Sequence, residues 1–398
     1  MPGKDSTNDQ ASNAKKGKAT TSSQVVTADS VQAEEVPTIP LGPIQTLNSL
    51  QPEVTVHSVA STRSVSMPSP LVVQPSEYRR SLGEWLQIWW EGIRPSYLPL
   101  SILPLLLGSV LAWMQTITIK TPLGHFHFLH FLLALASIIL LQIGAHLIND
   151  YYDYMHGIDT SNGLGPGGLI QQGLVKPANV LAVGLTALAF GTLGGIIVAM
   201  SGGLLVYVFG LVGLLCAYFY SATARSLSSL GLSELVSFLV FGPLITLGAY
   251  MIQTGHADRF VFVYSLPLGF LAAAVIHGNN MRDIESDAQA GKHTLASLVG
   301  LRLSRGIYLL LLIAAYVPLL VLAVPRHTLH LLLITLWTLP TLVVLITGIL
   351  RTDTPAGLHQ IMLQTIRLAT YFTLLLAVAL LITALWPVLP HIPAALPF

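Results

Sequence analysis

The chain has 398 residues, of which 53% are hydrophobic and only 9% are charged. Soluble domains carry about 25% charged residues, so this composition excludes an ordinary soluble protein and predicts an integral membrane protein. The net charge of +1 disfavours nucleic acid as a partner, and the single cysteine, Cys216, excludes an internal disulfide.

The N-terminal part of the chain differs in character from the rest. Residues 1–80 are rich in Ser, Thr, Gln, Val and Pro and contain no apolar run long enough to span a bilayer, so we expect a disordered tail. In the next segment, 81–93, three tryptophans alternate with acidic residues, which is typical of an amphipathic helix at a membrane surface. A transmembrane domain is expected to follow, at 94–390.

Apolar runs of about 17 to 25 residues, the length that crosses a bilayer, recur through this domain. They predict an all-α membrane protein, a bundle of about nine transmembrane helices. Most Lys and Arg residues near the span ends fall on the side of the N-terminus, and the positive-inside rule makes that side cytoplasmic. We therefore expect a multi-pass protein of the cell membrane. The expected spans cover 95–115, 128–149, 178–200, 203–220, 233–252, 260–281, 306–324, 328–349 and 367–387.

Two acidic clusters end the second and sixth expected spans. The first motif is Asn149-Asp150-Tyr151-Tyr152-Asp153, and the second motif runs from Asn279 through Asp283 to Asp287. Carboxylates are costly near hydrocarbon, so such residues usually bind an ion, a proton or a charged substrate. Both motifs begin with Asn-x-x-x-Asp, which hints at an internal repeat of four-helix halves.

The residue types of the two motifs indicate a particular ion. On a helix, Asn149 shares a face with Asp153, and Asp283 shares one with Asp287. Oxygen ligands without nearby His or Cys suit Mg²⁺, which combines a few carboxylates with water and phosphate oxygens. Facing motifs would thus hold Mg²⁺ and, through it, a diphosphate. The alternative is that these acids are only polar helix caps at the interface.

Four cations on the same side can neutralise such an anion directly. Each can instead be a determinant of topology. They are Arg94, Arg225, Arg282 and Lys292.

Several segments resemble one known family. The run NNMRDIESDAQAGKHTLASLVG is similar to the second signature of the UbiA superfamily of intramembrane prenyltransferases, in its MenA-type 1,4-dihydroxy-2-naphthoate polyprenyltransferase branch. Further similarity lies in NDYYDYMHGID, GPGGLIQQGLV, IRPSYLPLSILPLLLG and LGLSELVSFLVFGPLITLGAYMIQTG, so that the resemblance covers about 85–390.

The resemblance implies a function. It implies Mg²⁺-dependent transfer of a polyprenyl group from polyprenyl diphosphate to 1,4-dihydroxy-2-naphthoate, giving demethylmenaquinone in menaquinone biosynthesis. Asp153, Asp283 and Asp287 would be catalytic as the allylic C–O bond ionises. The implied metal ligands are Asn149, Asp150, Asp153, Asp283 and Asp287.

Aromatic side chains near the motifs can stabilise an allylic cation, although they can equally be interfacial belt residues. They are Tyr151, Tyr152, Tyr218 and Tyr220.

Three alternatives stay open on the sequence. The acceptor can be another aromatic compound, such as 4-hydroxybenzoate or homogentisate, or a lipid precursor. The acids can belong to a cation-coupled transporter, although transporters usually place them near the bilayer midplane. The loop 159–173, rich in Gly and Pro, can be a lid over the site or a plain connector.

Overall fold

The computed structural model describes residues 80–118, 126–157, 168–223, 225–323 and 327–385. Within these ranges the chain consists of helices and turns, with no strand. In chain order the elements are α1 (Leu82–Ile93), η1 (Pro95–Tyr97), α2 (Pro99–Thr118), α3 (Phe128–Met155), α4 (Pro177–Gly202), α5 (Leu204–Phe219), η3 (Ser228–Leu230), α6 (Ser233–Leu239), η4 (Val240–Leu244), α7 (Ile245–Thr254), α8 (Arg259–Arg282), α9 (Ile284–Gln289), α10 (Leu295–Ala314), α11 (Val317–Ala323), η5 (His327–Thr338), α12 (Leu339–Arg351) and α13 (Pro355–Leu385).

The expected helical membrane bundle is confirmed. In the described part of the chain, 7 helices or continuous helix groups are long and apolar enough to cross a bilayer. Helices α1 and α2 pass the same test only as a pair bent by 54°, and α5 is apolar but has 16 residues. Large apolar side chains such as Met200 and Trp337 are exposed on the outside of the bundle, where lipid can cover them.

Several helices extend beyond the apolar runs that predicted them. Helix α3 continues to Met155, so the first motif lies inside its last turns rather than after its end. Helix α13 begins at Pro355, well before its predicted start, and α10 begins at Leu295 but is kinked at Gly300, whose φ of 75° and ψ of 165° are not helical. The physical reason is that an apolar run marks only the part of a helix that lies in hydrocarbon, whereas backbone hydrogen bonding continues into polar sequence.

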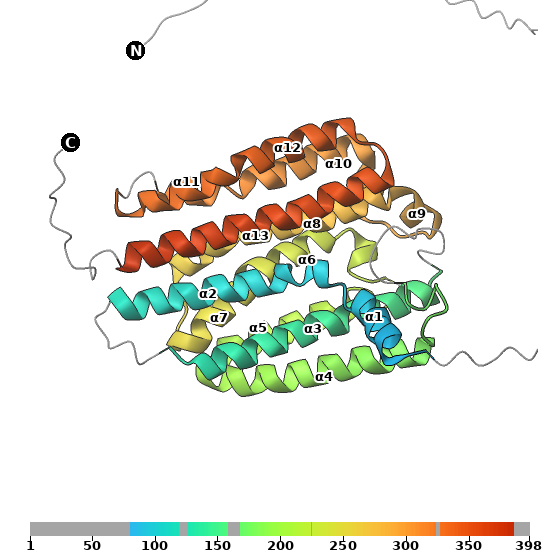
Figure 1. Cartoon of the computed structure of the whole chain (residues 1–398), viewed down its shortest axis with the longest axis horizontal. Coiled ribbons are helices and arrows are strands. Elements are labelled where there is room, and N and C mark those ends of the chain that lie inside the picture. Colours follow the sequence, from blue (N-terminus) through green and yellow to red (C-terminus); the bar gives the residue numbers. More distant parts are fainter. Residues whose placement is uncertain (1–79, 119–125, 158–167, 224, 324–326, 386–398) are drawn as a thin grey trace, which may run out of the picture. The chain divides into compact units, whose positions relative to one another are not determined.

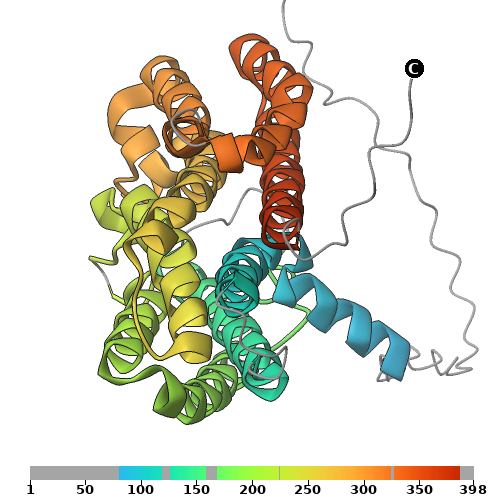
Figure 2. The ribbon, with the colours of Figure 1, turned by 90° about the vertical axis from the view of Figure 1, so that its left-hand side faces the viewer.

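The two motifs lie at the same end of the bundle. Figure 1 shows the long helices side by side, with α9, which carries part of the second motif, at the end where α3 also finishes. In Figure 2, α8 and α3 are seen nearly end-on within the same bundle. The orientation of this end toward the cytoplasm stays a prediction.

Close packing brings the helices of the first half together. A Cβ atom on Gly144 of α3 would lie 2.8 Å from the carbonyl oxygen of Gly184 in α4, so only glycine permits this approach of the two backbones. The largest apolar cluster extends from α2 and α7 through α8 to α10 and α13, where Tyr308 and Phe372 are fully buried. The cavity described below lies on the first-half side of this core.

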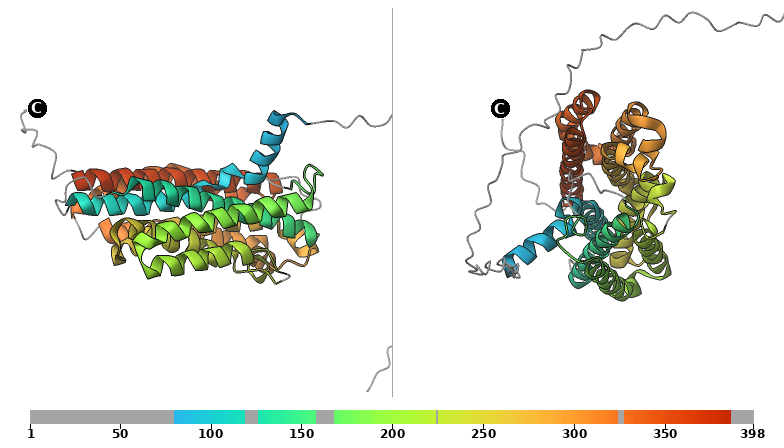
Figure 3. Two further views of the ribbon diagram at one scale, coloured as in Figure 1. Left: turned by 90° about the horizontal axis from the view of Figure 1, so that it is seen from below. Right: turned by 90° about the vertical axis from the view of Figure 1, so that its right-hand side faces the viewer.

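Helix α1 projects from the side of the bundle and packs against α3 through Ile88 and Trp89. Figure 3 shows it projecting sideways from the packed helices. Its N-terminus is closed by a capping box, in which the Glu84 carboxylate accepts from the Ser81 amide at 2.6 Å. Leu82, Leu86 and Trp90 are exposed, which gives the apolar face expected of an interfacial helix. Contact of this face with a membrane surface stays a prediction.

Candidate active site

A cavity of about 800 Å³ lies among α2, α3, α4, α5, α7 and α8. Residues of α3 line it from Ala134 to Asp153, which corresponds to a helix rise of about 28 Å. Charged and amide side chains gather at the end where the two motifs lie, and the remaining wall is mostly apolar. The charged and amide residues at that end are Arg94, Asn149, Asp150, Asp153, Gln171, Gln172, Asn279, Asn280, Arg282, Asp283 and Lys292. The two motifs therefore contribute to one cavity.

The first motif is held together by hydrogen bonds of Asn149. Its amide nitrogen donates to the Asp153 carboxylate at 2.8 Å and to the Ser221 hydroxyl oxygen at 2.7 Å. The first bond joins positions i and i+4 of α3, as the spacing predicts. Asp153 itself is buried, so this arrangement fixes a carboxylate at the cavity wall.

The second motif repeats this bond on α8 and adds a guanidinium. The Asn279 amide nitrogen donates to Asp283 Oδ2 at 3.3 Å. Arg282 donates through Nε and a terminal nitrogen to the two oxygens of Asp283, both at 2.6 Å. Asp287 is buried beside Lys292, whose Nζ lies 3.5 Å from Asp287 Oδ1. Asp287 does not line the cavity, whereas Lys292 does.

A bend between α1 and α2 connects the two motifs. We call residues Arg94 to Tyr97 the elbow. The Arg94 guanidinium donates to Asn149 Oδ1 and to Asp150 Oδ1, each at 3.2 Å. The Tyr97 hydroxyl donates to Asn279 Oδ1 at 3.0 Å. Four residues of chain thus fix both asparagines, one on each side of the cavity.

The elbow is strained at Arg94. Its φ of 55° and ψ of 60° lie in the left-handed region, and among the described residues it is the one non-glycine residue with positive φ. This conformation costs a side-chain-bearing residue about 1–2 kcal/mol. The interactions of its guanidinium with the first motif offset that cost.

Asp150 ties the chain segment after the first motif to the same place. Its two oxygens accept from the backbone amides of Gly168 at 2.7 Å and Leu169 at 3.0 Å, and from Arg94. The turn that begins at Gly168 is therefore fixed over the polar end of the cavity. The rest of the expected lid, 159–167, lies outside the described residues.

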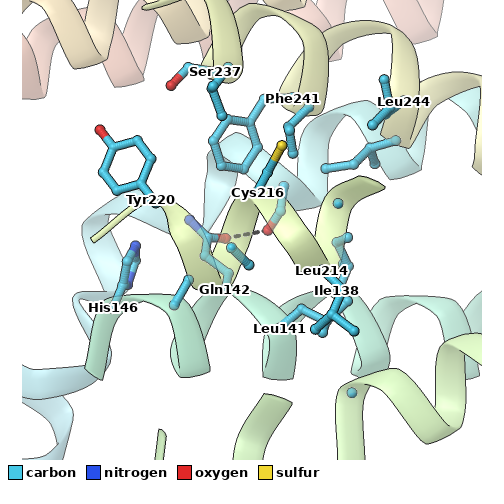
Figure 4. Close-up of a pocket in the computed structure, with 18 of the residues that line it drawn as sticks. Ile138, Leu141, Gln142, His146, Leu214, Cys216, Tyr220, Ser237, Phe241 and Leu244 are labelled. Atoms are coloured by element: carbon cyan, nitrogen blue, oxygen red, sulfur yellow. Dashed lines mark hydrogen bonds between the residues drawn. The ribbon is translucent and has the colours of Figure 1, made fainter. Parts of the chain in front are cut away.

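Along α3, with increasing distance from the two motifs, the cavity wall becomes less polar and then apolar. Figure 4 shows His146 and Gln142 projecting from α3 toward Tyr220 and Cys216. Gln142 donates to the Tyr97 carbonyl at 2.8 Å and accepts from the Ser101 hydroxyl, so both ends of its amide group form hydrogen bonds with neighbouring residues of the cavity wall. Farther from the motifs, the side chains labelled in Figure 4 are Ile138, Leu141, Leu214, Phe241 and Leu244.

The structure brings together most, but not all, of the residues selected from the sequence. Tyr151 packs instead in an apolar cluster with Ile88 and Trp89 of α1, and Arg225 is exposed. Asp287, Tyr151, Tyr152, Tyr218 and Arg225 do not line the cavity. Those that do are Arg94, Asn149, Asp150, Asp153, Tyr220, Arg282, Asp283 and Lys292.

Sequence reasoning missed Tyr97 and His146, which both line the cavity. The signal for His146 was its position three residues before Asn149, which places both on one helix face. Tyr97 gave no such signal, because its partner Asn279 lies 182 positions away.

The donor set fits a Mg²⁺ site that a substrate completes. Among the described residues, no three His, Cys, Asp or Glu side chains converge on one point. Asp153 and Asp283 instead face one cavity from two helices. Mg²⁺ commonly takes one or two carboxylates and fills its other positions with water and phosphate oxygens, so the two motifs suit it.

Comparisons with known proteins identify the family and the fold of the chain. The model of the UbiA prenyltransferase family matches residues 101–369. The chain is 30% identical over 310 residues to the 1,4-dihydroxy-2-naphthoate octaprenyltransferase of Bacillus subtilis, covering 78% of this chain and 96% of that protein. It is 31% identical over 284 residues to UbiA prenyltransferase domain-containing protein 1 of Danio rerio, covering 71% and 81%. A UbiA homolog from Archaeoglobus fulgidus, solved bound to GPP and Mg²⁺, has the same fold with a TM-score of 0.51 at 15% identity, covering 73% of this chain and 99% of that one.

Proposed function

The chain belongs to the UbiA prenyltransferase family, and on that premise we propose that it transfers a polyprenyl group from a polyprenyl diphosphate to 1,4-dihydroxy-2-naphthoate. The reaction would take place at the polar end of the cavity, with that end facing the cytoplasm. Family membership favours an enzyme over the cation-coupled transporter that the sequence alone left open.

One observation carries the proposal. Carboxylates of two helices and three cations line the polar end of a cavity whose other end is apolar. A polyprenyl diphosphate has the same division, since its diphosphate is polyanionic and its tail is hydrocarbon. The cavity wall on α3 extends for about 28 Å, close to the thickness of a bilayer core, so a tail can lie along it.

The cations would bind the diphosphate directly. Arg94, Arg282 and Lys292 all line the polar end, and each is held by an acidic partner that fixes its position. Positioned guanidinium and ammonium groups stabilise the negative charge that develops on a leaving diphosphate. When the allylic C–O bond breaks, the electron pair leaves with the diphosphate, and a ring carbon of the acceptor forms the new bond to the allylic carbon. That ring carbon then releases the group it carried, a proton or the carboxylate as CO2, which restores the aromatic ring.

The carboxylates would hold the metal. Asp153 and Asp283, with Asn149 and Asp150 beside the first, are the residues we assign to Mg²⁺. When bound, Mg²⁺ supplies Lewis-acid stabilisation of the diphosphate oxygens. Asp287 does not line the cavity and would act indirectly, because its carboxylate contacts Lys292 and thereby orients that cation.

The identity of the acceptor rests on the named relative and is the part to test first. Purified protein with Mg²⁺ and a polyprenyl diphosphate should prenylate 1,4-dihydroxy-2-naphthoate in preference to 4-hydroxybenzoate and homogentisate. Transfer to one of the other two, with none to the naphthoate, would assign a different acceptor to the same site. No transfer to any acceptor by folded protein would overturn the proposal.

A further inference from the structure

His146 is a polar group in the cavity that the roles above do not use. It projects from α3 toward Tyr220, as Figure 4 shows, and lies between the first motif and the apolar part of the wall. Its ring is half-buried and meets the Tyr97 ring edge-on, with 5.9 Å between the centroids.

The backbone of the elbow orients this ring. His146 Nδ1 lies 3.0 Å from the carbonyl oxygen of Ile93. Because a carbonyl can only accept, Nδ1 carries the proton, and Nε2 of the neutral imidazole is then an acceptor. No hydrogen bond to Nε2 is present among the described residues. The cavity therefore offers a fixed lone pair at this point.

The position of His146 along α3 restricts what it can bind. It lies three residues before Asn149, about 4.5 Å farther from the polar end. With the diphosphate at the motifs, this is the level of the allylic carbon and of the ring that attacks it. A lone pair repels phosphate oxygens but accepts from a hydroxyl group. An arginine or lysine would have the opposite preference.

We propose that His146 is an acceptor-binding residue, whose Nε2 accepts a hydrogen bond from a ring hydroxyl of the hydroxylated aromatic acceptor. The inference rests on the proposed function and adds a recognition element to it. The bond orients the ring beside the allylic carbon, and it withdraws the hydroxyl proton partly from oxygen, which makes the ring more electron-rich. It also disfavours acceptors that have no hydroxyl at this place, because Nε2 would then stay unpaired.

The test uses the full-length protein and the variant His146→Asn. The Asn side chain can still donate to the Ile93 carbonyl but lacks an acceptor at the place of Nε2. We expect KM for 1,4-dihydroxy-2-naphthoate to rise about five-fold to ten-fold, the effect of one lost hydrogen bond, with KM for the donor unchanged. His146→Gln, whose side-chain oxygen can reach the place of Nε2, should recover part of the loss. The matched control is His256→Asn, an exposed histidine in the turn between α7 and α8 that does not line the cavity.

A second measurement separates recognition from a structural role. The two monohydroxy naphthoates that each lack one hydroxyl are used as competitive inhibitors. The analogue that lacks the contacting hydroxyl should bind wild type and His146→Asn equally, whereas the other should bind the variant more weakly. Equal weakening of both analogues, or a rise in donor KM alone, would overturn the inference. Absence of any transfer by the wild type would instead refute the proposed function, so the two failures are distinguishable.

Discussion

Arg94 offers the sharpest test of how the elbow works, because stability and activity should respond differently to its replacement. Both Arg94→Ala and Arg94→Gly remove the hydrogen bonds to Asn149 and Asp150. Only glycine relieves the backbone strain at φ 55°.

The magnitudes follow from these contacts. Asp150 keeps the amides of Gly168 and Leu169, so loss of the guanidinium should destabilise the fold by about 1–3 kcal/mol. Alanine retains the left-handed strain and glycine does not, so Arg94→Gly should be more stable than Arg94→Ala by about 1 kcal/mol. In a unit of this size the difference corresponds to roughly 2 °C in Tm.

Activity should not follow stability. Both variants lack one of the groups that stabilise the leaving diphosphate, so kcat should fall by about 10²-fold in each. Arg94→Lys keeps the charge but not the two-pronged contact, and an intermediate rate is expected. Thermal unfolding in detergent and prenyl transfer are measured on the same preparations. Arg94→Ala as stable as Arg94→Gly would refute the strain argument, and near-normal transfer by either would remove Arg94 from the site.

Three further outcomes are expected. Chelation with EDTA should abolish prenyl transfer and Mg²⁺ should restore it; full turnover without a divalent metal would refute the metal assignment. In a Cys216→Ser background, a cysteine introduced at Gln289 should resist an impermeant thiol reagent applied outside intact cells, whereas a cysteine introduced at Ala257 should react. The reverse labelling pattern would show the opposite topology. Gly248 is buried, yet a Cβ there meets nothing within 4 Å, because the residue faces the cavity. Gly248→Leu should therefore slow transfer from long polyprenyl donors more than transfer from a geranyl donor. The control is Gly306→Leu, on the outside of α10, which should slow neither. Equal slowing of both donors by Gly248→Leu would place the tail elsewhere.

The fold was predictable because each span is a local property of the sequence. A run of apolar residues needs only its own length to indicate a membrane helix. The same holds for the bond between Asn149 and Asp153, since helical spacing alone brings them together. The extensions of α10 and α13 were not predictable in this way, because hydrophobicity does not mark where a helix ends outside the membrane.

The composition of the cavity wall depends on contacts between distant segments. Sequence placed Tyr218 and Arg225 at the correct end of the bundle, but it gave no information on which way their side chains face. Tyr97 reaches Asn279 only because the elbow folds back between α3 and α8. That arrangement is tertiary, and no periodicity within either segment encodes it.

In the proposed enzyme the two motifs form one binding site for the diphosphate and its metal. The most direct test is calorimetric titration of a non-reactive donor analogue in the presence of Mg²⁺, on wild type, Asp153→Asn, Asp283→Asn and the double variant. Each single change should weaken binding strongly, and the double variant should be little weaker than either, because the carboxylates act as a unit. Full affinity after loss of one motif, or strictly additive losses, would contradict a shared site.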